Sequence, residues 1–150
     1  MRAKDVMKRQ VVFVEVDDVL EKVVSVLMQN HVSGVPVVDK NNQLVGIVTE
    51  KDLMTKKMGL NISSYMEFVT SILLVDGKKL LAVSQENVLA MTAGDIMSTP
   101  VYSVRQEATI EEIVSLMMNR HINRIPVIDQ KNKLVGIIGR NDLLPILMSF

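Results

Sequence analysis

The chain has 150 residues, and its 17 Lys and Arg residues balance 17 Asp and Glu residues. This balance, with only 3% aromatic residues, disfavours a nucleic-acid binder that relies on a basic face or on base stacking. The chain has no Cys, which excludes disulfides and thiol chemistry, and its two His disfavour a closed zinc site, so we expect no bound metal. No apolar run approaches the roughly 20 residues of a membrane span, and the start shows no signal peptide. We therefore expect a cytoplasmic protein that contacts neither membrane nor nucleic acid.

An internal repeat covers most of the chain. Residues 3–54 align with residues 93–144 at a constant offset of 90 without a gap, and about 20 of the 52 pairs are identical. Two copies with so long a period do not form a solenoid. The sequence instead predicts two related halves packed about a pseudo-two-fold axis, in an α/β (α+β) fold.

Each repeat is expected to have the order β-α-β-β-α. In the first repeat these elements are a strand at 11–16, a helix from 17 to about 30, strands at 35–39 and 44–48, and a helix from 49 to about 58. The helix has an amphipathic face, and the Asn-rich residues 40–43 form a turn between the strands. The second repeat is predicted to give the same order between residues 101 and 149.

The segment between the repeats has no counterpart in either of them. We divide the chain into repeat one at 1–58, an insert at 59–92 that is expected to be helical, and repeat two at 93–150. The insert contains the very apolar run 72–75, which we expect to pack on the repeats or on a second chain.

A short stretch at the end of the first repeat, Leu44–Leu53, combines an apolar strand with a helix start. Thr49 is a favoured helix N-cap, and Asp52 lies three residues later, where the helix dipole favours a negative charge. The second repeat has Asp142 at the equivalent position but Gly139 in place of the hydroxyl. Thr49 with Asp52 is also what a capping box requires, so a purely structural role competes with a binding role.

These motifs together resemble a tandem pair of cystathionine-β-synthase (CBS) domains, often called a Bateman module. The matching segments are Asp5–Met7, His31–Asp39 and Leu44–Leu53, with their equivalents in the second repeat. The resemblance implies a regulatory module, not an enzyme, that senses AMP, ADP, ATP, S-adenosylmethionine or a related adenosyl ligand in clefts between the repeats. It also implies a homodimer that either acts on a separate effector protein or serves as a free-standing sensor, and that needs no other cofactor.

The resemblance places the stronger ligand site around Asp52. In that family the aspartate takes the ribose hydroxyls, and a carboxylate that only accepts hydrogen bonds suits a diol. Thr49 is expected to contact phosphate or ribose, and a basic residue of the partner repeat is expected to contact phosphate, for which a guanidinium is suited. The residues implied for this site are Thr49, Asp52 and Lys51, with Arg124 and Asn123 for phosphate, and Gln10, Val11, Val12, Val35 and Pro36 for the adenine. A solvated surface role for Arg124 is the competing interpretation.

The second cleft is expected to be weaker. It has Asp142 with Arg140 and Ser33 nearby, but Gly139 lacks a hydroxyl and Gly34 stands where the first cleft has Arg124. We expect this cleft to bind weakly, to bind something uncharged, or to stay empty, which leaves one good site per chain.

An alternative function is a structural homodimerisation or protein-interaction module with vestigial clefts. An enzyme is disfavoured, because the sequence shows no nucleophile–base arrangement, no paired catalytic carboxylates and no Gly-rich phosphate loop.

Overall fold

The computed structural model describes residues 1–54 and 91–149. The chain divides into two compact units, each of which holds one of two three-stranded sheets. The first-repeat unit consists of Val12–Asp39 and Val45–Pro100, and the second-repeat unit of Met1–Val11, Lys40–Leu44 and Val101–Phe150. Both repeats show the predicted order β-α-β-β-α, which confirms the expected α/β class. The insert and its apolar run 72–75 lie outside the described residues, apart from its last two positions.

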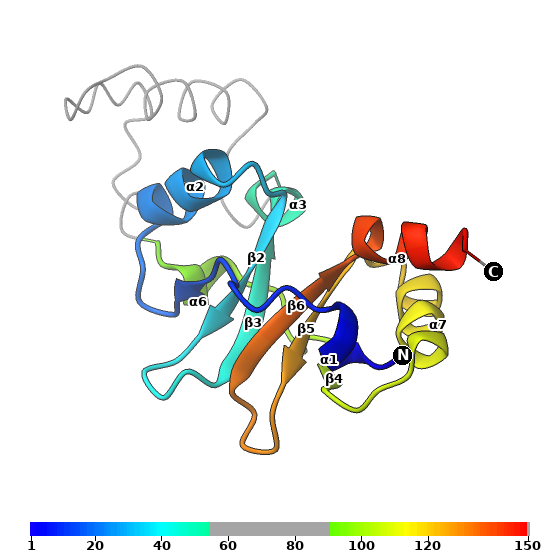
Figure 1. The fold of residues 1–150 in the computed structure, drawn as a ribbon. Coiled ribbons are helices and arrows are strands. Elements are labelled where there is room, and N and C mark those ends of the chain that lie inside the picture. The colour runs from blue at the N-terminus through cyan, green and yellow to red at the C-terminus, as the bar shows by residue number, and fades with distance from the viewer. Residues whose placement is uncertain (55–90, 150) are drawn as a thin grey trace. The chain divides into compact units, whose positions relative to one another are not determined.

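The first-repeat unit has a sheet with the strand order β1-β2-β3 (Figure 1). Strand β1 is parallel to β2, with Val14 opposite Val37. The elements of this unit are β1 (Val14–Glu15), α2 (Leu20–Gln29), β2 (Gly34–Val38), β3 (Leu44–Thr49), α3 (Glu50–Leu53) and α6 (Ala93–Ile96).

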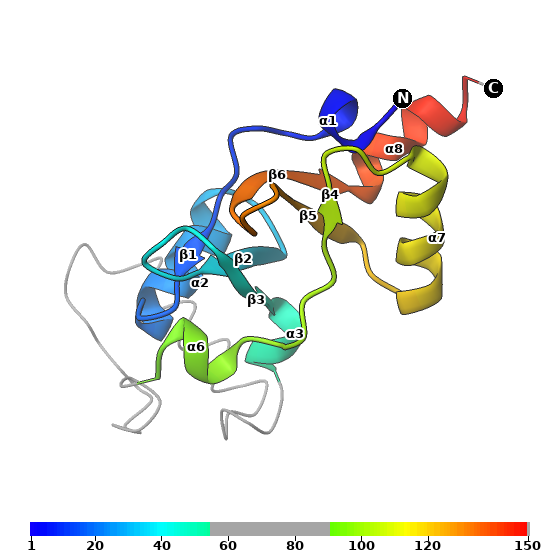
Figure 2. The same cartoon turned by 90° about the horizontal axis from the view of Figure 1, so that it is seen from below.

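The second-repeat unit repeats this arrangement with the strand order β4-β5-β6 (Figure 2). Its elements are α1 (Ala3–Val6), β4 (Val104–Arg105), α7 (Ile110–Arg120), β5 (Arg124–Ile128), β6 (Leu134–Gly139) and α8 (Arg140–Leu147). Among these residues and those of the first-repeat unit, no helix combines the length and apolar character needed to cross a membrane.

Each unit has its own apolar core. Strand β2 is buried at every position, whereas β3 alternates between buried and half-buried residues. Helix α2 buries Leu20, Val23, Val24 and Leu27, which recur at helical spacing and pack with β2 and β3. The second core is built in the same way around Ile113, Ile125 and Ile138. Burial of these faces positions the strand ends that carry the candidate site.

The first predicted strand and helix are shorter in the structure than the sequence suggested. The strand expected at 11–16 covers only Val14–Glu15, and the helix expected from residue 17 begins at Leu20. The reason is a turn between them, in which an Asp18 carboxylate oxygen accepts the Glu15 N–H at 2.8 Å and the Asp18 N–H donates to the Glu15 carbonyl. Asp18 therefore closes a turn and does not cap the helix.

The short helices that open each repeat are exchanged between the units. Helix α1 opens the first repeat, but Ala3 N–H donates to the Ala108 carbonyl at 2.8 Å, inside the second-repeat unit. Helix α6 opens the second repeat, but Ala93 N–H donates to the Asp18 carbonyl at 2.8 Å, inside the first-repeat unit. Both alanines are fully buried. The repeat boundaries in the sequence and the unit boundaries in space are therefore different.

Candidate functional site

The predicted stretch around Asp52 forms a hydrogen-bonded strand-to-helix corner. Strand β3 ends at Thr49, which is the N-cap of α3. One Asp52 carboxylate oxygen, Oδ2, accepts the Thr49 N–H at 2.8 Å and the Thr49 hydroxyl at 3.1 Å. The Asp52 N–H returns a hydrogen bond to the Thr49 hydroxyl at 3.4 Å. The capping box expected as the structural interpretation is thus present, and it fixes the direction of the carboxylate.

The other Asp52 oxygen is contacted by a residue that sequence reasoning missed. Ser98 donates its hydroxyl to Asp52 Oδ1 at 2.5 Å. Ser98 reaches this place because its backbone bridges Ile47 of β3, with N···O distances of 2.8 and 3.3 Å. The exchange of the helices that open each repeat brings Ser98 here. The alignment shows that Ser98 and Lys8 are equivalent at the offset of 90, but it does not identify the aspartate that either of them contacts.

The same corner occurs around Asp142 in the second-repeat unit. Asp142 Oδ2 accepts the Gly139 N–H at 2.8 Å, at the start of α8, but Gly139 supplies no hydroxyl. Asp142 Oδ1 forms an ion pair with the Lys8 ammonium at 3.4 Å. The Lys8 side chain is 68% exposed, whereas that of Asp142 is 19% exposed. The Arg140 N–H donates to the Asn123 carbonyl at 2.8 Å, which ties the start of α8 to the start of β5.

The predicted site residues fall into both units. Those in the unit of Asp52 are Thr49, Lys51, Val12, Val35, Pro36 and Ser33; those in the unit of Asp142 are Gln10, Val11, Asn123, Arg124 and Arg140. Ser33, which was expected beside Asp142, accepts the Glu50 N–H through its carbonyl at 2.9 Å and so lies at the start of α3. Val35 is fully buried in the core.

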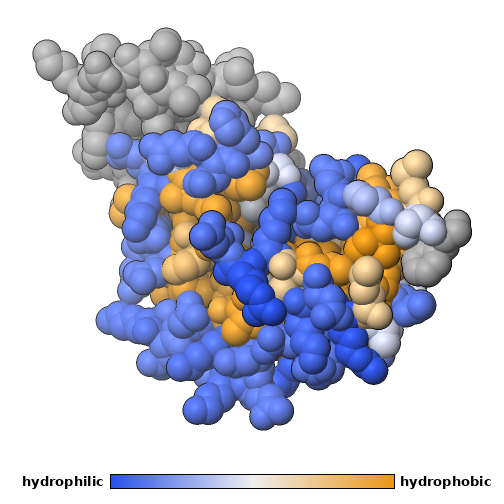
Figure 3. Space-filling model, in the orientation of Figure 1, coloured by the Kyte–Doolittle hydropathy of each residue, from blue (hydrophilic) through white to orange (hydrophobic). Residues whose placement is uncertain are grey.

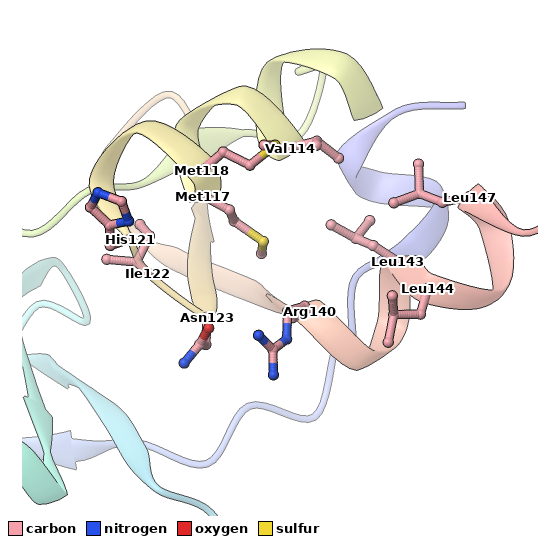
Figure 4. Close-up of a pocket in the computed structure, with 10 residues that line it drawn as sticks. All are labelled: Val114, Met117, Met118, His121, Ile122, Asn123, Arg140, Leu143, Leu144 and Leu147. Atoms are coloured by element: carbon pink, nitrogen blue, oxygen red, sulfur yellow. The ribbon is translucent and has the colours of Figure 1, made fainter.

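A groove of about 420 Å³ lies between α7 and α8 of the second-repeat unit (Figure 4). Its wall is mostly apolar and includes Met117, Met118, Leu144 and Leu147, and Arg140 lies at one end. Met118 is 70% exposed, and the leucines are nearly half exposed. Figure 3 shows apolar surface in this region, flanked by polar residues. In the described part of the chain, no group of His, Asp and Glu side chains is arranged to hold a metal ion.

Comparison with known proteins identifies the family. The CBS domain model matches residues 3–59 and 93–149, and the chain therefore belongs to the CBS domain family as a tandem pair. The chain is 30% identical to the uncharacterized protein MJ1426 of Methanocaldococcus jannaschii, over 99% of this chain and 92% of that protein. It is also 30% identical to the chloroplastic CBS domain-containing protein CBSX2 of Arabidopsis thaliana, over 86% of this chain and 53% of that protein.

Solved structures share the fold. A crystal structure of CBSX2 in complex with AMP superposes with a TM-score of 0.73 at 22% identity, covering 99% of this chain and 96% of that chain. The CBS domain pair of protein MJ0100, in complex with 5′-methylthioadenosine and S-adenosyl-L-methionine, superposes with a TM-score of 0.69 at 17% identity, covering 99% and 97%.

Proposed function

We propose that this chain is a regulatory module that binds an adenosine nucleotide or a related adenosyl ligand at Asp52 and responds through a change in conformation or stability. The proposal assigns it no catalytic step. The observation that carries it is the Asp52 corner, where Thr49 and Ser98 hold a half-buried carboxylate in a fixed direction. Two CBS-pair proteins of the same fold are described as complexes with AMP and with S-adenosyl-L-methionine.

The chemistry of the corner suits a ribose. A carboxylate offers about four acceptor positions and no donor. Thr49 fills two of them on Oδ2 and Ser98 fills one on Oδ1, so the two O–H groups of a vicinal diol pair with Asp52 when a hydroxyl of Ser98 or Thr49 turns from the carboxylate to the ligand. The neighbouring hydroxyls of Thr49 and Ser98 each combine one donor with acceptor capacity, so they can extend the network to the same diol. A fixed carboxylate also loses little freedom on binding, and less of the interaction energy is spent on ordering it.

Arg124 is the candidate for phosphate recognition. It begins strand β5 in the second-repeat unit, next to Asn123, and is half-buried. A guanidinium presents a planar set of donors that matches phosphate oxygens. Its participation at the Asp52 site is a prediction from the sequence, and it implies that Arg124→Ala weakens AMP binding while leaving adenosine binding nearly unchanged.

A thermal-shift panel with AMP, ADP, ATP and S-adenosylmethionine tests the proposal on the wild type and on Asp52→Ala. A ligand present at 100 times its Kd adds roughly 2.7 kcal/mol to the stability of the folded state, a shift of several degrees for a chain of this size. We expect such a shift with one of these ligands and expect Asp52→Ala to abolish it.

A matched control is available because α6 begins with the same capping box. Asp95 Oδ2 accepts the Thr92 N–H at 2.9 Å and the Thr92 hydroxyl at 3.1 Å, in the same unit as Asp52. Asp95→Ala therefore removes an equivalent cap, worth about 1 kcal/mol, three residues before Ser98, while Thr49, Asp52 and Ser98 all keep their side chains. We expect this variant to keep the ligand-induced shift. Equal ligand shifts in Asp52→Ala and wild type would contradict the proposal, as would no shift with any ligand.

We further infer that the chain forms a homodimer through the α7–α8 groove, which also serves the alternative function of a structural interaction module. Three large apolar side chains are exposed along this face: Met118, Leu144 and Leu147. The groove has Arg140 at one end, and Glu111 lines the surface near Leu147 at the other end. A two-fold axis across the groove brings unlike ends of two copies together and covers the apolar centre.

A further inference from the structure

The two aspartate corners are geometrically equivalent but receive chemically different partners. The Lys8 backbone bridges Ile137 with N···O distances of 2.9 and 3.0 Å, as the Ser98 backbone bridges Ile47 in the other unit. Each incoming side chain contacts Oδ1 of its aspartate, and in both corners Oδ2 accepts a backbone N–H at 2.8 Å. Among these contacts and those of Thr49 and Gly139 with the same aspartates, the matched positions that differ are 8 against 98 and 139 against 49. The residues just before the aspartates also differ, Glu50 and Lys51 against Arg140 and Asn141.

The side chain at the first of these matched positions changes the charge of the corner. Ser98 brings a hydroxyl and no charge to Asp52, whereas Lys8 brings a full positive charge to Asp142. An uncharged ligand hydroxyl that binds Asp142 has to compete with an ammonium for the carboxylate. A ligand that also carries an anionic group offers the ammonium a second partner, so Lys8 can turn from the carboxylate to the ligand. Its exposed, flexible side chain permits this movement.

We propose that residues 8 and 98 determine the ligand class of the two corners. Ser98 lets Asp52 accept uncharged nucleoside hydroxyls, whereas Lys8 makes Asp142 selective for a ligand that bears an anionic group next to its hydroxyls. This inference rests on the proposed function, since it requires the aspartates to bind ligand hydroxyls. It adds a selectivity that the proposed function does not contain, and it differs from the expectation that the second cleft takes something uncharged.

Adenosine and AMP are the probes, because they differ only in the phosphate. Isothermal titration calorimetry measures the two affinities in two parent proteins, each with one aspartate replaced. The first parent, Asp142→Asn, retains only the Asp52 corner, and the second parent, Asp52→Asn, retains only the Asp142 corner. In the first protein we expect Ser98→Lys to weaken adenosine binding about fivefold relative to AMP, the size of an exposed charge pair. In the second protein we expect Lys8→Ser to strengthen adenosine binding about fivefold relative to AMP.

The control is Lys4→Ser, which removes a charge of the same sign from the same segment. Lys4 pairs with Glu107 at 3.2 Å and does not contact Asp142. We expect it to leave the ratio of adenosine to AMP affinity within twofold of its parent. Lys8→Ser alters an exposed side chain and keeps the test valid if Ser98→Lys fails to fold.

The two levels of the proposal fail in different ways. If the wild type binds neither adenosine, AMP nor another adenosyl ligand, the proposed function is wrong and this inference is wrong with it. If the wild type binds such a ligand but Lys8→Ser leaves adenosine binding to Asp52→Asn unimproved, or Lys4→Ser shifts the affinity ratio equally, only the assignment of residues 8 and 98 is overturned.

Discussion

Asp129 organises the turn between β5 and β6. Its carboxylate accepts the Lys133 N–H at 2.9 Å and the Lys131 N–H at 2.8 Å. The Lys133 N–H contributes most to lowering the pKa of Asp129 below its usual range. Desolvation, the next largest effect, opposes it, and the Lys131 N–H and the charges of both lysines lower the pKa further. A carboxylate that accepts two backbone donors pins the chain where Asn132 takes a left-handed conformation with φ 64°.

We predict that Asp129→Asn lowers the free energy of unfolding at pH 7 and that the loss disappears in acid. Because the folded pKa is lowered, the charged carboxylate stabilises the fold above the unfolded pKa of about 4. That contribution is lost as the pH falls through the folded value. Urea unfolding of wild type and Asp129→Asn between pH 7 and pH 2 measures the difference. If the difference in unfolding free energy between the two proteins stays constant down to pH 2, the charge of Asp129 does not cause the destabilisation, and the prediction is wrong.

At the scale of single residues, the sequence predicted the hydrogen-bonded corner at Asp52, because residues close together in the chain form it. Thr49 and Asp52 form the expected corner because an N-cap and its partner are three residues apart and need no distant contact. Ser98 was missed because it lies 46 positions from Asp52 along the chain. The missing hydroxyl at Gly139 was evident from the sequence. The contact between the Lys8 ammonium and Asp142 could not be predicted without knowing that the helices are exchanged.

At the scale of elements, the contact between the segment after α1 and strand β6 depends on a glycine. A Cβ added at Gly136 would lie 2.8 Å from Cγ and 3.0 Å from Cβ of Met7, and it would also overlap the sulfur. Met7 is nearly buried there. Gly46 and Met97 make the same contact in the first-repeat unit. Each glycine therefore provides the space into which a methionine from the other repeat packs.

We predict that Gly136→Ala destabilises the protein by about 1–3 kcal/mol, the usual cost of overpacking a core. Most of this loss is expected to vanish when Met7→Ala is added, because the shorter side chain leaves room for the new methyl group. Chemical denaturation of the two single variants and the double variant gives a coupling energy. Additive effects of the two substitutions would show that Gly136 does not act through Met7.

The sequence predicted the elements whose position follows from the periodic spacing of apolar residues. It did not predict those whose length or packing depends on residues far away in the chain. Helix α2 and strands β2, β3, β5 and β6 follow from their apolar spacing. Strand β1 is only two residues long because pairing with β2 ends where the Asp18 turn begins. The alignment of the repeats showed that Ala3–Met7 and Ala93–Met97 are equivalent, but not that each packs in the other repeat's unit, because equivalence does not specify a partner.

At the scale of the whole molecule, the exposed α7–α8 face determines the assembly that we infer. We predict that Leu144→Glu converts the dimer to a monomer, since it places a charge in the apolar centre of the groove. Leu144 is 46% exposed and follows Arg140 by four residues, so the new carboxylate is tolerated within one chain. Size-exclusion chromatography with light scattering over a concentration series measures the change.

Gln130→Glu provides the control for that experiment. It adds the same charge in the exposed turn between β5 and β6, away from the groove. We expect this variant to keep the mass of the wild type. A monomeric wild type, or equal masses for Leu144→Glu and wild type, would rule out this face as the dimer contact.

The exchanged helices also fix an order of events during synthesis. Residues 3–8 are translated more than a hundred positions before Gln106, Ala108 and Ile137, the residues whose backbone they pair with. In the nascent chain, α1 therefore lacks the strand that it packs against until nearly all of β6 has been synthesised. The first-repeat unit likewise waits for residues 93–98 before it is complete. The first-repeat unit therefore cannot finish folding when its own repeat has just been translated, and the second-repeat unit has to recruit a segment from the far end of the chain. Long-range closure of this kind slows folding.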